Sequence, residues 1–371
     1  MKKILLLIIT LLLLGVSGCW DMEDIENKNI VTTVVIDKTD EGYELYLEIA
    51  TTAATGQGSE SQQSPPNNII IQSKGKTFEE VRKDLERKSN KTIFPGAISC
   101  IVFTERMAID SLEEYIYRMR QDSEFRKTLS IFIFNGEPME LLEVKIKANP
   151  LVGLDINETL KSLQQIGQGI EITTLDILEG LCCPNKGFIV PTLSIINDSI
   201  TVTGYSIFDK GKLLGLIESD EIDGLIALCG EKYRAGHVII YEGVSYTLDI
   251  ERTKKKFKVI LENNNIVYHI SIYFKGEILY SNKQITINQN TIKKINPIIN
   301  EKIKTIIEEE LIRSISTYKV DYLSLYDYFR IQHPVFARNN NWDTLYPTIK
   351  YNVDINIKLK NNFQIDYQYG D

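Results

Sequence analysis

Ile98-Ser99-Cys100-Ile101-Val102-Phe103 is a continuous apolar run, and Leu129-Ser130-Ile131-Phe132-Ile133-Phe134 is a second one further along the chain. Such runs are typical of strands that are buried on both faces. Between the two runs, Leu112, Ile116 and Met119 recur at helical spacing. A strand, a helix and a strand in this order favour parallel pairing through a right-handed crossover. The N-terminal half is therefore expected to be α+β.

The residues before this unit predict a hairpin, a loop and a helix. Asn29 to Ile36 and Tyr43 to Thr52 are the expected strands, and the second alternates apolar with polar side chains. Gly56 to Asn68 is rich in Gly, Ser, Gln, Pro and Asn, and it is expected to be a loop because it cannot bury enough apolar surface. Thr77-Phe78-Glu79-Glu80 has the form of a capping box. The helix that it opens has one apolar face, made of Phe78, Val81 and Leu85.

The C-terminal half predicts strands and one long helix. Residues 136–190 are polar and are expected to be mainly helical, and Pro184 and Pro191 are expected to end this helical region. Pro297 is expected to be the first residue of the long helix, behind Asn296 as its cap. The apolar stripe of this helix is Ile299, Ile303, Ile306 or Ile307, and Leu311. The other expected elements are a hairpin at 201–208 and 212–217, a short helix at 218–228, strands at 244–250, 256–261 and 266–274, and a closing strand at 348–359.

Together these elements predict a multidomain α+β protein with mixed sheets, each covered by helices, and with the long helix packed on the C-terminal sheet. A mature chain of roughly 350 residues is long for a single core. We expect residues 1–18 to be a signal peptide, 19–197 an N-terminal α+β domain and 198–371 a C-terminal α+β domain. A further division near residue 136 is left open, and the main boundary is placed near Asn197.

The N-terminus predicts export and lipidation. Met1-Lys2-Lys3 is a short cationic segment, and Ile4 to Leu14 is an apolar run that only Thr10 interrupts. This run is too short for a stable membrane-spanning helix, which needs about 20 residues, so it fits a cleaved signal. Val16-Ser17-Gly18-Cys19 resembles a lipobox. We therefore expect cleavage after Gly18 and lipid on Cys19, which would tie the body to a membrane surface.

Charge and residue usage exclude several classes of function. The formal charge is −8, and removing Lys2 and Lys3 takes it to −10, so the chain has no basic surplus for nucleic acid. Four further cysteines in an exported chain permit disulfides without requiring them. With three histidines and no CxxC motif, a metal site is not expected, and no cofactor is implied. These cysteines and histidines are Cys100, Cys182, Cys183, Cys229, His237, His269 and His333.

The sequence gives no catalytic residue. It contains no GxSxG elbow, no HExxH motif and no P-loop. Paired carboxylates such as Glu79-Glu80, Glu113-Glu114 and Glu308-Glu309-Glu310 fall at expected helix starts or on exposed helix faces, where they are solvated charge. We therefore expect a non-enzyme. The alternative to a receptor-type subunit is the substrate-binding lipoprotein of a transporter, although its doubly wound lobes would alternate strands and helices more regularly than residues 244–274 do.

Several segments resemble one family in the same order along the chain. Gly18-Cys19-Trp20-Asp21-Met22-Glu23-Asp24-Ile25 resembles the start of the Ger(x)C family, the lipoprotein C subunits of spore germinant receptors. Further segments that resemble the family are Gly75 to Glu80, Gly204 to Phe208, Lys212 to Gly215, Glu221 to Leu225, and Trp342 with the closing strand. The chain departs from the family's pattern at Gly96-Ala97-Ile98 and at Asp327 to Arg330, which puts details of its surface in doubt.

The resemblance implies a non-catalytic subunit on the outer face of the spore inner membrane. It would sit beside a membrane-embedded A subunit and a transporter-like B subunit, with Cys19 carrying the lipid. The resemblance does not say which nutrient the assembly detects, or which A and B subunits it contains.

Overall fold

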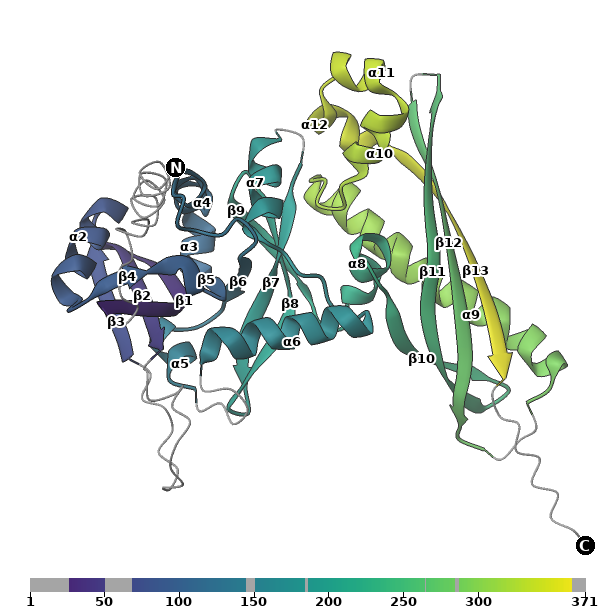
Figure 1. The fold of residues 1–371 in the computed structure, drawn as a ribbon. Helices are drawn as coiled ribbons and strands as arrows, with labels where there is room; N and C mark the ends of the chain where they lie inside the picture. The colour runs from purple at the N-terminus through teal and green to yellow at the C-terminus, as the bar shows by residue number, and fades with distance from the viewer. Residues whose placement is uncertain are drawn as a thin grey trace, which may run out of the picture.

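The computed structural model describes residues 27–50, 69–144, 151–183, 186–263, 265–283 and 287–361. These residues form two sheets that lie side by side, each with helices against it (Figure 1). The fold is α+β, as the sequence predicted. The expected loop at 56–68 and the whole signal segment lie outside the described residues.

The first sheet has nine strands and mixes parallel with antiparallel pairs. Its strands are β1 (Lys28–Thr39), β2 (Gly42–Ala50), β3 (Ile69–Gly75), β4 (Thr92–Phe94), β5 (Cys100–Thr104), β6 (Ser130–Phe134), β7 (Phe188–Ile196), β8 (Ser199–Asp209) and β9 (Lys212–Glu218). They lie in the order β3-β2-β1-β5-β6-β7-β8-β9, with β4 pairing to β1. β5 and β6 are parallel, which confirms the pairing expected for the two apolar runs.

Helices cover both faces of this sheet, which explains why its central strands are apolar throughout. Ile101 and Phe103 point to one face and Cys100 and Val102 to the other, and all four are fully buried. The first face packs against α2 (Phe78–Lys88), α3 (Glu105–Asp110), α4 (Glu113–Gln121) and α7 (Thr174–Cys182); the second packs against α5 (Pro138–Leu142) and α6 (Val152–Ile166). A short 3-10 turn, η3 (Pro95–Ala97), follows β4.

Helix α2 begins as predicted, with one difference at its cap. The Thr77 hydroxyl accepts a hydrogen bond from the Glu80 backbone N–H at 3.3 Å. The Glu80 carboxylate accepts from the N–H of Lys76 at 2.8 Å, rather than from the cap residue itself. Phe78, Val81 and Leu85 are buried on one face, as expected.

The second sheet has four strands and carries the long helix. Its strands are β10 (Arg234–Tyr241), β11 (Val244–Glu262), β12 (Asn265–Ser281) and β13 (Lys350–Asn361), paired in that order. β11 is continuous through the two strands that we expected separately at 244–250 and 256–261. The helical elements of this part are α8 (Ile222–Cys229), α9 (Gln289–Ile312), η4 (Arg313–Tyr318, a π-helical turn), α10 (Leu325–Gln332), α11 (Pro334–Asn339), α12 (Trp342–Leu345) and η5 (Tyr346–Thr348).

The long helix α9 starts earlier than predicted. Asn288 is its cap, because its side-chain oxygen accepts hydrogen bonds from the N–H groups of Asn290 and Thr291 at 3.0 Å. Pro297 therefore lies inside the helix and not at its first position. The predicted apolar stripe is confirmed, and it is extended towards the N-terminus: Ile292, Ile295, Ile299, Ile303, Ile307 and Leu311 are buried.

Two side chains of β11 fix the short helix α8 to the middle of the sheet. The Arg252 guanidinium donates to four carbonyl groups at the C-terminus of α8, those of Ile226, Ala227, Gly230 and Glu231. Lys255 Nζ donates to a fifth, that of Leu228, at 2.5 Å. Cations are stabilised at this end of a helix, where the last carbonyl groups have no partner within the helix.

The boundary expected near Asn197 does not coincide with the change of sheet. Asn197 and Asp198 have φ of 50° and 58° and form the two-residue turn between β7 and β8. Positive φ at both central residues is the geometry of a tight hairpin turn, for which Asn and Asp are suited. β8 and β9 therefore continue the first sheet, and the second sheet begins only at Arg234.

The sequence analysis places Pro191 at the end of the preceding helical region. In the structure it lies inside β7 instead. Pairing between β6 and β7 starts only at Thr192, so at Pro191 the strand has a ladder on the β8 side alone. A strand position with one free side tolerates a residue that lacks an N–H. Pro184, the other expected end, lies outside the described residues.

Candidate functional sites

The predicted lipidation site, Cys19, lies outside the described residues. The other four cysteines are free thiols. Cys100 is fully buried in the first sheet, and burial raises the pKa of its thiol, so it is an unreactive core residue. Cys182 is exposed at the end of α7.

The three histidines lie on separate elements; His237 and His333 have polar contacts, whereas the Nε2 atom of His269, on β12, is buried without a hydrogen-bond partner among the described residues. His237 is buried in β10, and its Nε2 lies 2.8 Å from the Tyr233 hydroxyl. Burial, with a contribution from Lys302, lowers the pKa of His237 to about 4. His333 Nε2 lies 3.0 Å from the backbone oxygen of Val259. Within the described ranges, no group of three or more His, Cys, Asp or Glu side chains is placed to hold a metal ion.

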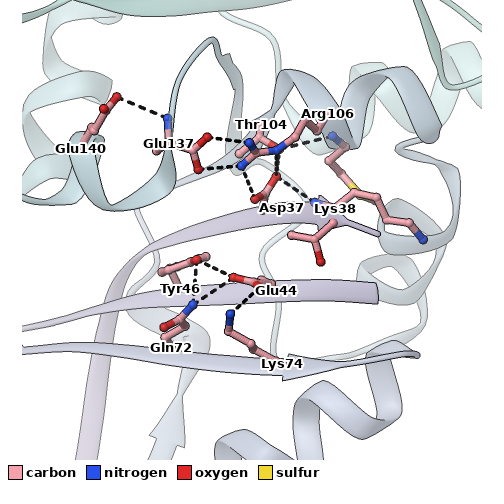
Figure 2. Close-up of polar contacts among 12 residues, drawn as sticks. Asp37, Lys38, Glu44, Tyr46, Gln72, Lys74, Thr104, Arg106, Glu137 and Glu140 are labelled. Carbon is pink, nitrogen blue, oxygen red and sulfur yellow. Dashed lines mark hydrogen bonds and ion pairs between the residues drawn. The ribbon is translucent and has the colours of Figure 1, made fainter. Parts of the chain in front are cut away.

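A polar cluster that no sequence pattern predicts lies at the ends of β1 and β5 (Figure 2). Asp37 is buried there, and its carboxylate accepts from Arg106 Nε at 3.1 Å and from Arg106 Nη2 at 2.6 Å. The same guanidinium donates to both oxygens of Glu137, at 2.6 and 2.8 Å. Hydrogen bonds to Glu137 and Asp37 raise the pKa of Arg106. Because each charge has a partner of opposite sign, this cluster joins β1, α3 and α5 rather than forming a reactive site.

A second cluster lies on the neighbouring strands, on β2 and β3 (Figure 2). The Glu44 carboxylate accepts from the Tyr46 hydroxyl, from Gln72 Nε2 at 2.9 Å and from Lys74 Nζ at 2.6 Å. Although burial opposes it, these contacts hold the pKa of Glu44 below its ordinary value. All its members are paired, so this cluster also stabilises the sheet.

Glu48 is fully buried and caps a helix from a distant strand. Its Oε1 accepts from the N–H of Val152 at 2.8 Å, at the start of α6, and its Oε2 accepts from the Thr32 and Thr33 hydroxyls at 2.9 and 2.5 Å. The N-terminus of a helix favours an anion. Gly153 is required beside it, because a Cβ there would lie 2.2 Å from the Thr33 hydroxyl oxygen.

The junction between the two sheets is held by buried polar groups. Lys186, with a side chain only 5% exposed, lies 2.8 Å from Glu179 of α7 and 2.5 Å from Asp327 of α10. The N–H of Gly187 donates to the backbone oxygen of Asp321 at 3.2 Å. A cleft of about 470 Å³ opens here, lined by residues of both parts, among them Lys186 and Tyr328.

Asp321 organises the C-terminal side of this junction. Its carboxylate accepts from the N–H groups of Leu325 and Tyr326, at 2.8 and 2.7 Å, and from Trp342 Nε1 at 3.1 Å. Burial raises the pKa of Asp321 to about 6, although these hydrogen bonds oppose the shift. The carboxylate thus fixes the start of α10 and the indole of Trp342 in one arrangement.

A larger groove, of about 870 Å³, lies between α2 and α4. Its apolar wall includes Phe78, Leu85 and Tyr115, and Arg82 and Arg118 also line it. Asn27, the first described residue, lines it too. The groove therefore opens where the chain arrives from Cys19.

None of these clusters combines a nucleophile with a matching base, and their charged groups are engaged in structural contacts. In the described part of the chain, no helix has both the length and the apolar composition to cross a membrane. The arrangement is a two-part body whose parts meet at a junction of buried polar groups.

Comparison with known proteins relates the chain to spore germination proteins. Residues 21–195 match the family described as "Spore germination protein N-terminal domain". Residues 203–362 match the family described as "Spore germination B3/ GerAC like, C-terminal". Spore germination proteins YndF and B3 of Bacillus subtilis (strain 168) are each 23% identical to this chain, over 95% and 94% of its length and 95% of theirs. Spore germination protein A3 of the same organism is 28% identical over 71% of this chain and 72% of the relative.

The fold is also that of a solved structure. The crystal structure of the GerBC protein matches with a TM-score of 0.55 and 18% sequence identity, over 88% of this chain and 97% of that one. The gap between the two matched ranges falls at the β7–β8 turn, whereas the sheets change over later, between Glu218 and Arg234. Because the two family matches together cover nearly everything from residue 21 to residue 362, the chain belongs to the Ger(x)C family of spore germination proteins.

Proposed function

We propose that this protein is the membrane-anchored C subunit of a nutrient germinant receptor, lipidated on Cys19 and without catalytic activity of its own. It holds the A and B subunits together on the outer face of the spore inner membrane. The observation that carries the proposal is the position of the family match, which begins at residue 21, directly behind the lipobox cysteine. The fully paired polar clusters of the described body agree with a role in assembly.

The tether limits where the body can lie. Seven residues lie between Cys19 and Asn27, and the eight residue steps from one to the other span at most about 29 Å in a fully extended chain. Asn27, which lines the groove between α2 and α4, therefore lies within that distance of the lipid. A tether of this kind raises the effective concentration of the body at membrane partners without any new contact.

The rival function, a substrate-binding lipoprotein of a transporter, fits the architecture less well. Such proteins have two doubly wound lobes with a ligand between them. Here the second part is a four-stranded mixed sheet with one long helix, and its strands β10, β11 and β12 follow one another directly as antiparallel hairpins. Tight binding of an amino acid or a sugar by the purified protein would favour the rival.

The test of the anchor uses a clickable fatty acid in sporulating cells. We expect label on the wild-type protein and none on Cys19→Ser, because the thiol of Cys19 is the acyl acceptor. Cys182→Ser is the matched control, since Cys182 is an exposed free thiol elsewhere on the body, and its label should remain. Label retained on Cys19→Ser would contradict the proposal.

The test of assembly is co-purification of the A and B subunits with the tagged protein from spore membranes. We expect Cys19→Ser to reduce their recovery. Alanine at His237, His269 or His333 should leave nutrient-triggered germination near normal at equal protein level. A single histidine variant that folds, accumulates normally and stops germination would point to a catalytic or metal-dependent function instead.

A further inference from the structure

The outer edge of β10 offers unused backbone groups. Within the described ranges, β10 pairs with β11 alone. The two strands are joined by a two-residue turn at Glu242 and Gly243, so Tyr241 and Val244 form the first bonded pair of the ladder. In an antiparallel ladder the bonded and non-bonded pairs alternate. Arg234, Gly236, Val238 and Ile240 therefore direct their N–H and C=O groups away from β11.

Two contacts confirm this direction. The N–H of Arg234 donates to the backbone oxygen of Gly167, in the first part of the molecule, at 3.0 Å. Lys302 Nζ donates to the backbone oxygen of Val238 at 3.0 Å. The N–H of Arg234 is thus already paired with another segment of the chain, and the Val238 carbonyl group with a side chain of α9. The N–H groups of Gly236, Val238 and Ile240 point to the same side of β10.

Apolar side chains lie next to these rungs. Val238 is 50% exposed and Ile240 is 71% exposed. Thr247 of β11 pairs with Val238 on one side and with Tyr280 of β12 on the other, so Tyr280, which is 59% exposed, shares the same face. α9 packs on the opposite face of this sheet, and no described helix covers the face that carries these residues (Figure 1). An apolar edge strand of this kind is a site for addition of a further strand.

The chain itself contains a segment with the matching pattern. Residues 362–371, which lie outside the described part, read Asn-Phe-Gln-Ile-Asp-Tyr-Gln-Tyr-Gly-Asp. Apolar and polar residues alternate strictly from Phe363 to Tyr369, and all four apolar positions hold residues that favour strands. The matched C-terminal family range ends at residue 362, so nearly all of this segment lies beyond that range.

The two faces of such a strand fit the two sides of the edge. Phe363, Ile365 and Tyr367 would extend the apolar face beside Val238 and Ile240. The polar residues between these apolar positions, including Asp366, would then face α9. There Lys302 contacts the edge, and Lys294 lies over the Tyr241 ring at 5.8 Å from its centroid. The acidic residue of the segment therefore meets basic residues of the helix.

The position of β13 decides which copy supplies the strand. β13 is the opposite edge of the sheet, and its last residue, Asn361, pairs with Ile278. Three strand spacings of about 4.8 Å separate the two edges. Crossing them would use nearly half of the ten residues within one chain, so the first apolar positions could not reach β10. A second copy can present the whole alternating segment.

We propose that residues 362–371 of one copy add as a strand to the outer edge of β10 of a second copy, so that this protein self-associates through its C-terminal sheet. If each copy donates its segment to the other, the exchange closes into a twofold dimer. This inference goes beyond the proposed receptor function and does not depend on it.

The test is capture between two differently tagged full-length copies, co-expressed without other receptor subunits and solubilised in detergent. We expect Ile240→Asp and Ile365→Asp each to reduce capture at least ten-fold. Ile331→Asp is the matched control, because Ile331 is 73% exposed on α10, far along the chain from the edge, and capture should persist. Wild-type copies that do not capture each other, or capture that survives Ile365→Asp, would overturn the proposal.

Hydrogen exchange gives the second measurement. In the wild-type full-length chain the amides of Gly236, Val238 and Ile240 should be protected, and in Ile365→Asp they should exchange at least ten-fold faster. Equal exchange in both proteins contradicts strand addition. Protection of these amides without capture would mean that the segment pairs within its own chain, which overturns the role of a second copy.

Discussion

At the scale of single residues, Glu48 shows how a buried charge is accommodated. Its carboxylate is fully buried in β2, yet it accepts hydrogen bonds from two threonine hydroxyls and from the first N–H groups of α6. Leu151, the residue at the helix cap, offers no side-chain acceptor, so Glu48 takes that role from a strand far away in sequence. The sheet and the helix are therefore fixed to each other by one side chain.

This predicts a large effect of Glu48→Ala. Removing the carboxylate leaves the Thr33 hydroxyl and the N–H groups of Val152 and Gly153 without their acceptor, and each such buried group costs about 1–3 kcal/mol. We expect the free energy of unfolding to fall by at least about 3 kcal/mol in urea titration. Glu158→Ala on the exposed side of α6 is the control and should change it little. A Glu48→Ala protein as stable as the wild type would mean that the carboxylate does not cap the helix.

At the scale of elements, the strongest local signals were sufficient for much of the secondary structure. The apolar runs of β5 and β6, the Thr77 cap and the Asp209-Lys210-Gly211 turn were predicted, because each depends on neighbours in sequence. The six-residue helix α3 was missed, since it is too short to show a period, although Thr104 caps it. β10 was missed although its buried residues alternate, and its Gly236 weakens the strand signal.

Helix α9 carries a prediction of its own. Pro297 is exposed in the interior of the helix, where it lacks the N–H that would bond to the carbonyl group of Lys293. Pro297→Ala should restore that bond without loss of packing and raise the free energy of unfolding by about 1–3 kcal/mol. Glu301→Ala, at another exposed position of the same helix, is the control and should have a small effect. A lower unfolding midpoint for Pro297→Ala would show that the proline is required where it stands.

At the scale of the whole molecule, the polar clusters could not be predicted because their members are far apart in sequence. Asp37, Arg106 and Glu137 come from three elements that only the sheet brings together. The junction is similar, since Lys186 and Asp327 meet across the two sheets. The expected domain boundary near Asn197 falls at a hairpin turn within the first sheet, because β8 and β9 continue that sheet through contacts that are not local in sequence.

The junction predicts how the two parts depend on each other. Lys186→Ala leaves the half-buried Asp327 without its lysine partner. We therefore expect the part that holds the first sheet to separate more readily from the part that holds the second sheet. In calorimetry we expect one unfolding transition for the wild type and a broader or split transition for Lys186→Ala. The Gly187 amide should also exchange faster in the variant, because its hydrogen bond to Asp321 spans the junction. Lys161→Ala, an exposed lysine on α6, is the control. Unchanged melting and exchange in Lys186→Ala would show that the apolar contacts alone hold the junction.

The attachment of α8 to the middle of β11 has a mechanical consequence. β11 has 19 residues, which at about 3.3 Å each make a ribbon roughly 60 Å long. Arg252 and Lys255 bind α8 near the midpoint of β11, so the strand extends about 30 Å to either side of this attachment. A rotation of about 10° at this pivot would carry the two tips about 5 Å each, in opposite directions. Because α8 is attached at the midpoint of β11, any such rotation would move the two ends of the hairpin by equal distances in opposite directions.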